Sequence, residues 1–230
     1  MAHLAHYREA HPLPFVITHW INLICMILLI ITGFCIHYPF FEGFMGIVRG
    51  VHIFCGIVLT INCIVRVILA FFVKSAPTGG TRKTVTDYKT WLPQKDNRHQ
   101  AGAWIKYYLF IKKDHPLSAK LGVPQKITYV LVPVLILVMA YTGFALWSVT
   151  AGAPPFAAGV ELVGGAMSMR IIHYFLMYVF IAFMFIHIYL ANVEGLAPTK
   201  LMLFRKEHGG LTYDPDKHVI DGEDYSVDNH

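Results

Sequence analysis

Charged residues are scarce in this sequence. Asp, Glu, Lys and Arg make up 14% of the 230 residues, whereas 56% are hydrophobic, and the mean hydropathy is +0.52. A soluble domain with so few charges would be difficult to keep in solution. The composition therefore excludes an ordinary soluble protein and indicates a protein that lies in a lipid bilayer.

Cysteine is also scarce, and its spacing excludes several kinds of site. The four cysteines all fall inside long apolar runs and form no CxxC, CxxCH or secreted-type pattern: Cys25, Cys35, Cys55 and Cys63. We expect them to be buried small residues. Neither a disulfide framework, a zinc site nor covalently attached haem is indicated.

Four apolar runs are long enough to cross a bilayer, whose hydrocarbon core of about 30 Å requires roughly 20 helical residues. They cover residues 14–36, 51–73, 127–149 and 171–193. The first run is too long for a signal peptide and no small-residue cleavage site follows it, so we expect it to be retained. The sequence predicts an all-α membrane protein with a four-helix bundle over residues 1–198 and a polar cytoplasmic tail over residues 199–230.

Basic residues are concentrated between the second and third runs. Residues 74–126 contain eleven Lys and Arg residues against three Asp. The positive-inside rule predicts that this loop is cytoplasmic, and an even number of helices places both termini on the same side. The formal net charge of +5 then reflects membrane topology and requires no nucleic-acid partner.

Three connecting or terminal segments carry weaker signals. AWIKYYLFIKK (residues 103–113) places apolar residues near one helical face beside lysines, which predicts a membrane-surface helix. Residues 150–167 are rich in Gly, Ala and Pro, which predicts a short turn or an interfacial helix. Residues 213–230 are polar and acidic, and we expect a flexible tail.

Four histidines belong to the apolar runs or their ends: His19, His52, His173 and His187. A buried polar group in lipid is costly unless it is paired, so an intramembrane histidine marks a functional site by default. His173 and His187 are fourteen residues apart, which places them on nearly the same helix face about 21 Å from each other. Under the predicted topology His52 and His173 lie near the outer surface, and His19 and His187 near the inner one. Each level of the membrane thus contains two histidines on different helices.

This arrangement suits two stacked b-type haems. A macrocycle between helices requires one imidazole from each face, and a four-helix bundle is a usual place for such a site. Metal ions without haem would have two protein ligands each, too few for a closed zinc site.

Three further residues fit the same interpretation. Arg66 is fourteen residues after His52, where it would bind a propionate of the inner haem or snorkel to the cytoplasmic surface. Gly33 is fourteen residues after His19, and it would let the outer haem approach the backbone. Gly143 would do the same from the third helix, and for both glycines helix packing is an alternative explanation.

A three-residue match links the first and third runs. Thr32-Gly33-Phe34 and Thr142-Gly143-Phe144 each close a run near the predicted outer surface. Two helices that share this feature suggest a bundle with equivalent close approaches. A match this short between apolar segments also arises easily by chance.

Three segments resemble a known family: THWINLICMILLIITGF, RGVHIFCGIVLTINCIVRVILAFF and RIIHYFLMYVFIAFMFIHIYLANVEG. The family is the membrane cytochrome b subunit of respiratory nickel-iron hydrogenases, a relative of the formate dehydrogenase gamma subunit. The likeness covers roughly residues 14 to 210, and the histidines fourteen residues apart are its most specific element.

The resemblance implies a function and a set of ligands. The axial ligands of two haem b groups would be His19, His52, His173 and His187. The subunit would take electrons from a hydrogenase small subunit, and through it from the large subunit, on the outer face of a bacterial or archaeal cell membrane. It would pass them to menaquinone or ubiquinone near the inner face. Because the chain has no cysteine set for nickel-iron or iron-sulfur ligation, it would not activate hydrogen itself.

The quinone is expected at the inner haem. Quinone reduction consumes protons, and titratable or polar groups lie close to a span at the inner end: Asp114, His115, Asn192 and Glu194. Asp114 and His115 could instead cap or solvate the approach to the third helix. Two alternative functions are the equivalent subunit of a formate dehydrogenase or thiosulfate reductase, and a histidine-based proton relay or transporter-like protein. A visible spectrum separates the last of these, because a proton relay is colourless.

Overall fold

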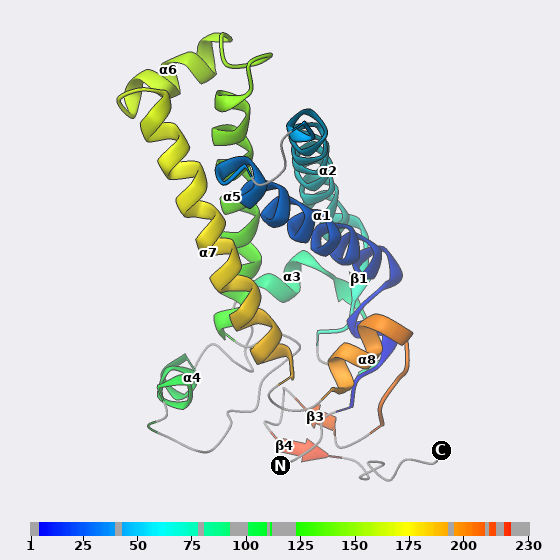
Figure 1. The fold of residues 1–230 in the computed structure, drawn as a ribbon. Helices are drawn as coiled ribbons and strands as arrows, with labels where there is room; N and C mark the ends of the chain where they lie inside the picture. Colours follow the sequence, from blue (N-terminus) through cyan, green and yellow to red (C-terminus); the bar gives the residue numbers. More distant parts are fainter. Residues whose placement is uncertain are drawn as a thin grey trace. The chain divides into compact units, whose positions relative to one another are not determined.

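The computed structural model describes residues 5–39, 43–77, 81–92, 101–109, 111, 123–192, 196–209, 212–214 and 219–221. These residues contain four long helices, several shorter ones and two small antiparallel sheets (Figure 1). The long helices are α1 (Leu13–His37), α2 (Met45–Phe72), α5 (Val123–Leu146) and α7 (Ala166–Asn192). Each is long and apolar enough to cross a membrane, in α5 over residues 126–146. The predicted mainly helical fold with four candidate spans is therefore confirmed.

The helices differ in length from the apolar runs. α2 begins at Met45 and α7 at Ala166, whereas the runs begin at residues 51 and 171. Hydropathy locates the part of a helix that suits hydrocarbon, while the backbone hydrogen bonds of α2 and α7 continue through Arg49 and Arg170 into the polar border. α5 ends at Leu146 because the chain turns there, with the Thr150 N–H donating to the Trp147 carbonyl at 2.9 Å.

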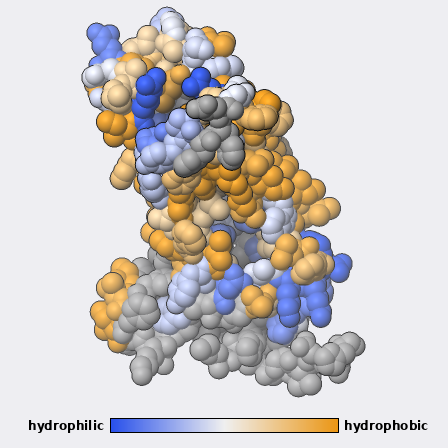
Figure 2. All heavy atoms as spheres, in the orientation of Figure 1, coloured by the Kyte–Doolittle hydropathy of each residue, from blue (hydrophilic) through white to orange (hydrophobic). Residues whose placement is uncertain are grey.

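The candidate spans present apolar side chains outward. Phe54, Phe175 and Phe185 are 66%, 64% and 71% exposed, and aliphatic residues on α1 and α5 are exposed in the same way. Figure 2 shows such apolar residues along the visible face of these helices. A soluble protein buries side chains of this size, whereas hydrocarbon solvates them without cost. The protein is an integral membrane protein.

The chain forms two compact units, which we call the helical unit (residues 17–65 and 133–190) and the terminal unit (residues 1–16, 66–132 and 191–230). The helical unit contains most of the four long helices and α6 (Pro154–Leu162). The Tyr141 hydroxyl donates to the Pro155 carbonyl at 2.7 Å, which fastens α6 to the end of α5. The helix allowed for in residues 150–167 is thus present.

The terminal unit contains short elements. They are η1 (Arg8–Ala10), β1 (Lys74–Ser75), β2 (Val85–Thr86), α3 (Tyr88–Trp91), α4 (Ala101–Tyr108), α8 (Ala197–Phe204), β3 (Thr212–Asp214) and β4 (Val219–Asp221). β1 pairs antiparallel with β2, with Lys74 opposite Thr86, and β3 pairs antiparallel with β4, with Thr212 opposite Asp221. The helix predicted in residues 103–113 is present over residues 103–108, as part of α4, and its place at a membrane surface stays a prediction.

The expectation of a flexible tail from residue 213 was wrong where β3 and β4 pair. Tyr213 pairs with Ile220, and Thr212 and Val219 lie beside them in the two strands; β-branched and aromatic residues of this kind favour extended structure. The prediction used the acidic composition of the whole segment and did not consider these few strand-forming residues. The polar tail predicted from residue 199 also begins within a helix, since α8 runs to Phe204.

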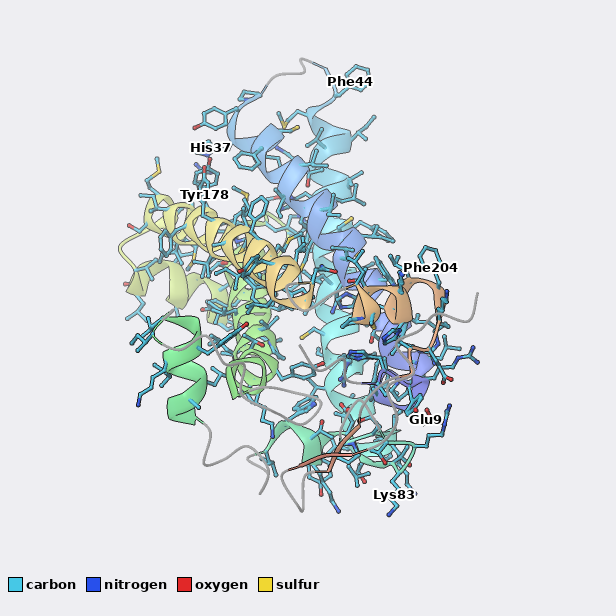
Figure 3. The ribbon with its side chains drawn as sticks, turned by 90° about the horizontal axis from the view of Figure 1, so that it is seen from below. Glu9, His37, Phe44, Lys83, Tyr178 and Phe204 are labelled. Carbon is cyan, nitrogen blue, oxygen red and sulfur yellow. The ribbon has the colours of Figure 1, made fainter. Side chains whose placement is uncertain are left out.

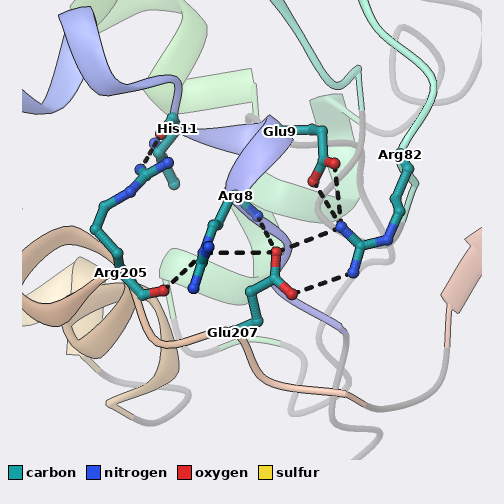
Figure 4. A network of polar contacts seen from close by, with 6 residues as sticks. All are labelled: Arg8, Glu9, His11, Arg82, Arg205 and Glu207. Atoms are coloured by element: carbon teal, nitrogen blue, oxygen red, sulfur yellow. Dashed lines mark hydrogen bonds and ion pairs between the residues drawn. The ribbon is translucent and has the colours of Figure 1, made fainter.

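A charge cluster in the terminal unit joins three segments that are distant in sequence (Figure 4). It comprises Arg8, Glu9, Arg82, Arg205 and Glu207. The Arg82 guanidinium donates to Glu9 Oε1 at 3.0 Å and to Glu207 Oε2 at 3.1 Å. The Arg8 backbone N–H donates to Glu207 Oε1 at 3.1 Å, and Arg205 donates to the His11 carbonyl.

Backbone hydrogen bonds accompany the charge cluster. His6 and His208 exchange N–H to carbonyl bonds of 2.9 and 3.1 Å, and the Ala76 N–H donates to the Glu9 carbonyl at 2.7 Å. The hydrogen bond from Arg82 lowers the pKa of the Glu207 carboxyl below its ordinary value. The N-terminal segment, the segment after α2 and the segment after α8 are thus held together by both side chains and backbone.

Candidate functional site

His52 on α2 and His173 on α7 form one histidine pair in the helical unit. Their ring centroids are 6.3 Å apart and the ring planes are inclined by 65°. The two rings therefore lie close to each other on different helices, and their role as ligands stays a prediction.

Each ring of this pair is held by a threonine. Thr32 Oγ1 lies 2.8 Å from His52 Nδ1, and Thr142 Oγ1 lies 2.8 Å from His173 Nδ1. A hydroxyl has one proton to donate. Thr32 donates it to the Leu28 carbonyl at 2.6 Å, and Thr142 donates it to the Met139 carbonyl at 2.9 Å.

Both hydroxyls must therefore accept a hydrogen bond from the histidine. The proton of each imidazole then lies on Nδ1, and the unprotonated Nε2 is the nitrogen left to bind a metal. His52 and His173 are thus held in the tautomer that a metal ligand requires.

A glycine lies beside each threonine and each histidine. A Cβ on Gly143 would lie 3.3 Å from His173 Cε1, and a Cβ on Gly33 would lie 3.6 Å from His52 Cε1 and 3.3 Å from Met177 Sδ. The repeated Thr-Gly-Phe therefore places two equivalent contacts against two equivalent histidines. Sequence reasoning noted the repeat and missed the threonines, although their position beside the glycines was the signal that could have identified them.

His19 on α1 and His187 on α7 form the second pair. Their ring centroids are 6.0 Å apart and the planes are inclined by 54°. His187 stacks on Phe183 at 5.7 Å, and His19 makes an edge contact with Trp20 at 5.6 Å. Within the described residues no hydrogen bond reaches a ring nitrogen of His19 or His187.

Amide side chains lie one turn from His19. The Asn62 amide on α2 donates to the Thr18 carbonyl at 2.7 Å and to Asn22 Oδ1 at 2.6 Å. Thr18 immediately precedes His19 and Asn22 follows it by three residues. This network ties α1 to α2 and fixes the backbone that carries His19.

Both pairs fit a bis-imidazole haem. An imidazole nitrogen lies about 2.0 Å from a bound first-row metal and about 1.1 Å from its ring centre, so rings on opposite sides of one iron have centroids roughly 6 Å apart. The centroid separations of 6.3 and 6.0 Å match this value. In the part of the chain that the structure describes, no three His, Cys, Asp or Glu side chains converge to hold a bare ion. A group that brings four equatorial donors of its own suits these paired histidines.

Other histidines and the cysteines lie apart from this arrangement. His37, at the end of α1, stacks on Tyr174 with centroids 3.9 Å apart and planes inclined by 9°, beside Tyr178 (Figure 3). The cysteines are free thiols; all are buried except Cys35, which is half-buried. This agrees with the expectation of small apolar residues.

Arg66, the predicted propionate ligand, has partners in the terminal unit. Its Nη2 donates to Asp87 Oδ2 at 2.9 Å, and its guanidinium lies 3.7 Å from the centre of the Phe15 ring. The Asp87 carboxylate is fully buried and also accepts hydrogen bonds from Ser75 at 2.6 Å and Trp91 at 3.1 Å. Arg66 Nη1 is buried and has no hydrogen-bond partner among the described residues. Arg66 does not snorkel freely, and one of its amino groups remains available to a carboxylate.

One of the four predicted quinone-site residues lies in the described structure. Asn192, the last residue of α7, accepts a hydrogen bond from Thr199 Oγ1 at 2.6 Å, which joins the ends of α7 and α8. Asp114, His115 and Glu194 lie outside the described residues.

Comparison with known proteins agrees with the resemblance found in the sequence. The model of the prokaryotic cytochrome b561 family matches residues 10–205. A probable Ni/Fe-hydrogenase B-type cytochrome subunit of Rhizobium leguminosarum bv. viciae is 26% identical over 80% of both chains. A probable Ni/Fe-hydrogenase 1 B-type cytochrome subunit of Escherichia coli (strain K12) is 29% identical over 84% of this chain and 85% of its own length. A cytochrome b binds haem b and transfers electrons. This chain belongs to the prokaryotic cytochrome b561 family.

Proposed function

We propose that the protein is the dihaem cytochrome b subunit of a membrane-bound nickel-iron hydrogenase and passes electrons to the quinone pool. The observation that carries this proposal is the presence of two histidine pairs with ring centroids 6.3 and 6.0 Å apart. The names of the Rhizobium and Escherichia coli relatives support the hydrogenase as the partner. The small subunit would dock at the outer face of the bacterial or archaeal inner membrane, with the large subunit attached through it.

The four histidines act as axial ligands in this proposal. His52 and His173 bind the outer haem, and His19 and His187 bind the inner one. Haem supplies a one-electron iron couple that is reduced and oxidised without forming or breaking bonds to substrate. The chain contributes four imidazole donors, of which His52 and His173 are held with Nε2 free, and one helix, α7, that carries one ligand of each pair fourteen residues apart.

Arg66 is proposed to bind a haem propionate. It follows His52 by fourteen residues on α2, and its buried Nη1 offers N–H groups to a carboxylate. Asp87 compensates part of the charge of Arg66 and orients its guanidinium.

The quinone site is proposed at the inner haem, with Asp114, His115, Asn192 and Glu194 around it. Electrons that arrive from outside and protons that are taken from inside would together move charge across the membrane, worth about 2.3 kcal/mol per charge at 100 mV. In Asp114→Asn and His115→Ala, quinone turnover should fall while both haems still become reduced. Unchanged turnover in both variants would remove this loop from the site.

The haem assignment is tested by replacing each histidine with alanine and measuring haem per chain and the reduced visible spectrum. His52→Ala and His173→Ala should lose the same haem, and His19→Ala and His187→Ala should lose the other, because each iron loses one of two axial bonds. His37→Ala is the matched control, since His37 stacks on a tyrosine and should leave both haems in place. Joint loss in the pattern of His173 with His187, or a colourless wild-type protein, would refute the assignment.

The hydrogenase partner is tested separately by copurification of the wild-type protein from its native membrane. Attached hydrogenase small and large subunits would support the proposal. A formate dehydrogenase or thiosulfate reductase subunit in their place would overturn the partner and leave the haem assignment intact.

A further inference from the structure

The two histidine pairs differ in what holds their rings. Both Nδ1–H groups of the His52/His173 pair donate to threonine hydroxyls at 2.8 Å. In the His19/His187 pair each ring contacts one aromatic side chain, Trp20 or Phe183, and in the described structure its ring nitrogens have no hydrogen bond. The two metal positions are therefore chemically unequal even though each has two imidazole ligands.

The threonine contacts increase the electron density of the ligands. When an Nδ1–H donates to an acceptor, the imidazole takes on more imidazolate character and Nε2 becomes a more basic donor. A more basic axial ligand stabilises ferric over ferrous iron. Hydrogen bonding to an axial ligand is one of the levers by which a protein sets a haem potential.

The acceptor role of the threonines is built into their helices. Thr32 and Thr142 donate their own protons to carbonyls of the preceding helical turn, at 2.6 and 2.9 Å, which leaves each hydroxyl oxygen as the acceptor toward the histidine. The adjacent glycines allow the rings close enough for the bonds to form. In each Thr-Gly pair the glycine leaves room for the imidazole ring, and the threonine accepts a hydrogen bond from it.

We propose that Thr32 and Thr142 are positioning residues that make the His52/His173 haem the lower-potential member of the pair, and so drive electrons from it to the His19/His187 haem. This inference rests on the proposed function, because it requires two bound haems. With both haems bound, the iron held by His52 and His173 would give one electron to the iron held by His19 and His187. No proton is transferred, and no bond is made or broken.

The test is a redox titration of the purified protein, followed by the reduced haem bands. The wild type should titrate as a low-potential and a high-potential component, and His19→Ala, which keeps the His52/His173 haem, identifies which is which. Thr32→Val and Thr142→Val keep the side-chain shape and remove the acceptor. Each should raise the low potential, with roughly a tenfold rise in the ferrous to ferric ratio at fixed potential, about 59 mV. The high-potential component should not move.

Three further variants control for structural effects. Thr60→Val removes a threonine on α2 that donates to the Gly56 carbonyl at 2.7 Å and contacts no histidine in the described structure, so both potentials should stay. Thr32→Ser and Thr142→Ser keep a hydroxyl and should retain the wild-type potential. If a valine variant loses haem, the corresponding cysteine variant carries the test, since a thiol accepts weakly and should give a smaller upward shift.

The outcomes separate this inference from the function on which it rests. A protein that binds fewer than two haems would overturn the proposed function itself. If two haems are bound but Thr32→Val and Thr142→Val leave the lower reduction potential unchanged, only the role of the threonines is overturned. That role would also be overturned if His19→Ala showed that the His52/His173 haem has the higher potential.

Discussion

At the scale of single residues, the site depends on very small groups. Gly143 and Gly33 act through the Cβ atom that they lack, and Thr142 and Thr32 act through one hydroxyl oxygen each. A change of one atom at these positions alters the approach or the basicity of a ligand.

Replacing Gly143 with alanine should reduce binding at the His52/His173 pair toward a total of one haem per chain. The new Cβ would lie 3.3 Å from His173 Cε1, tighter than an ordinary van der Waals contact, and it would push the imidazole away from its partner. Gly33→Ala should be milder, because its Cβ meets the flexible Met177 side chain first. Haem per chain from the reduced spectrum measures both effects.

Gly56→Ala is the control for these glycines. Its Cβ would meet only Leu29 at 4.0 Å, an ordinary contact, so haem content should stay at the wild-type level. Equal haem loss in Gly56→Ala and Gly143→Ala would mean that Gly143 is needed for helix packing and not for space beside His173.

Replacing Asp87 with asparagine should destabilise the protein by about 3 kcal/mol, because it leaves the largely buried Arg66 charge without its counterion. Ser75→Ala removes a single hydrogen bond to the same carboxylate and should cost about 1 kcal/mol. Denaturant unfolding in detergent measures both variants. Equal losses in the two would contradict an ionic role for Asp87.

At the scale of elements, the length of the apolar runs located the four long helices, and the runs began later than α2 and α7 do. Arg49 and Arg170 set the N-terminal limits of the second and fourth apolar runs, yet α2 and α7 begin before both positions. The cost of a charge depends on its depth in the bilayer, whereas helical hydrogen bonding does not. The pairing of β3 with β4 and the segments joined by the charge cluster were not predicted, because these contacts depend on how the chain folds back on itself.

The charge cluster should weaken as pH falls. The pKa of Glu207 is lowered in the folded protein, chiefly by Arg82, so its contribution is present above the ordinary pKa of 4.5 and is lost as pH falls through the lowered value. Arg82→Gln should have a similar effect at neutral pH. Faster amide exchange at His6 and His208, which exchange backbone hydrogen bonds, would report the loosening.

Lys83→Gln is the matched control for Arg82→Gln. Lys83 is exposed beside Arg82 and makes no ion pair in the described structure, so its replacement should leave the exchange rates unchanged. Added salt should accelerate exchange in the wild type, because the cluster is exposed and ions screen it. Exchange that responds to neither pH nor salt would show that the backbone bonds alone hold the segments.

At the scale of the whole molecule, the direction of electron transfer depends on orientation in the membrane. The eleven basic residues in 74–126 predict that this loop and both termini face the cytoplasm. A reporter enzyme that works only in the cytoplasm should therefore be active when fused after His230, and one that works only outside should be inactive there. A cysteine introduced near Gly152, between α5 and α7, should be labelled by a reagent added outside the cell. The opposite pattern would exchange the inner and outer assignments of the two haems.

The sequence alone determined the membrane class, the four helices and the four histidines, because hydrophobic length and the cost of a polar group in lipid are local properties of the chain. With the predicted topology it also suggested the pairing of His52 with His173 and of His19 with His187, since each pair lies at one level of the membrane. Only the tertiary structure decided that Thr32 and Thr142 accept hydrogen bonds from the two histidines, and that Arg66 is paired with Asp87. Side-chain hydrogen bonds between helices depend on rotation and crossing of the helices, which residue spacing along one chain does not specify.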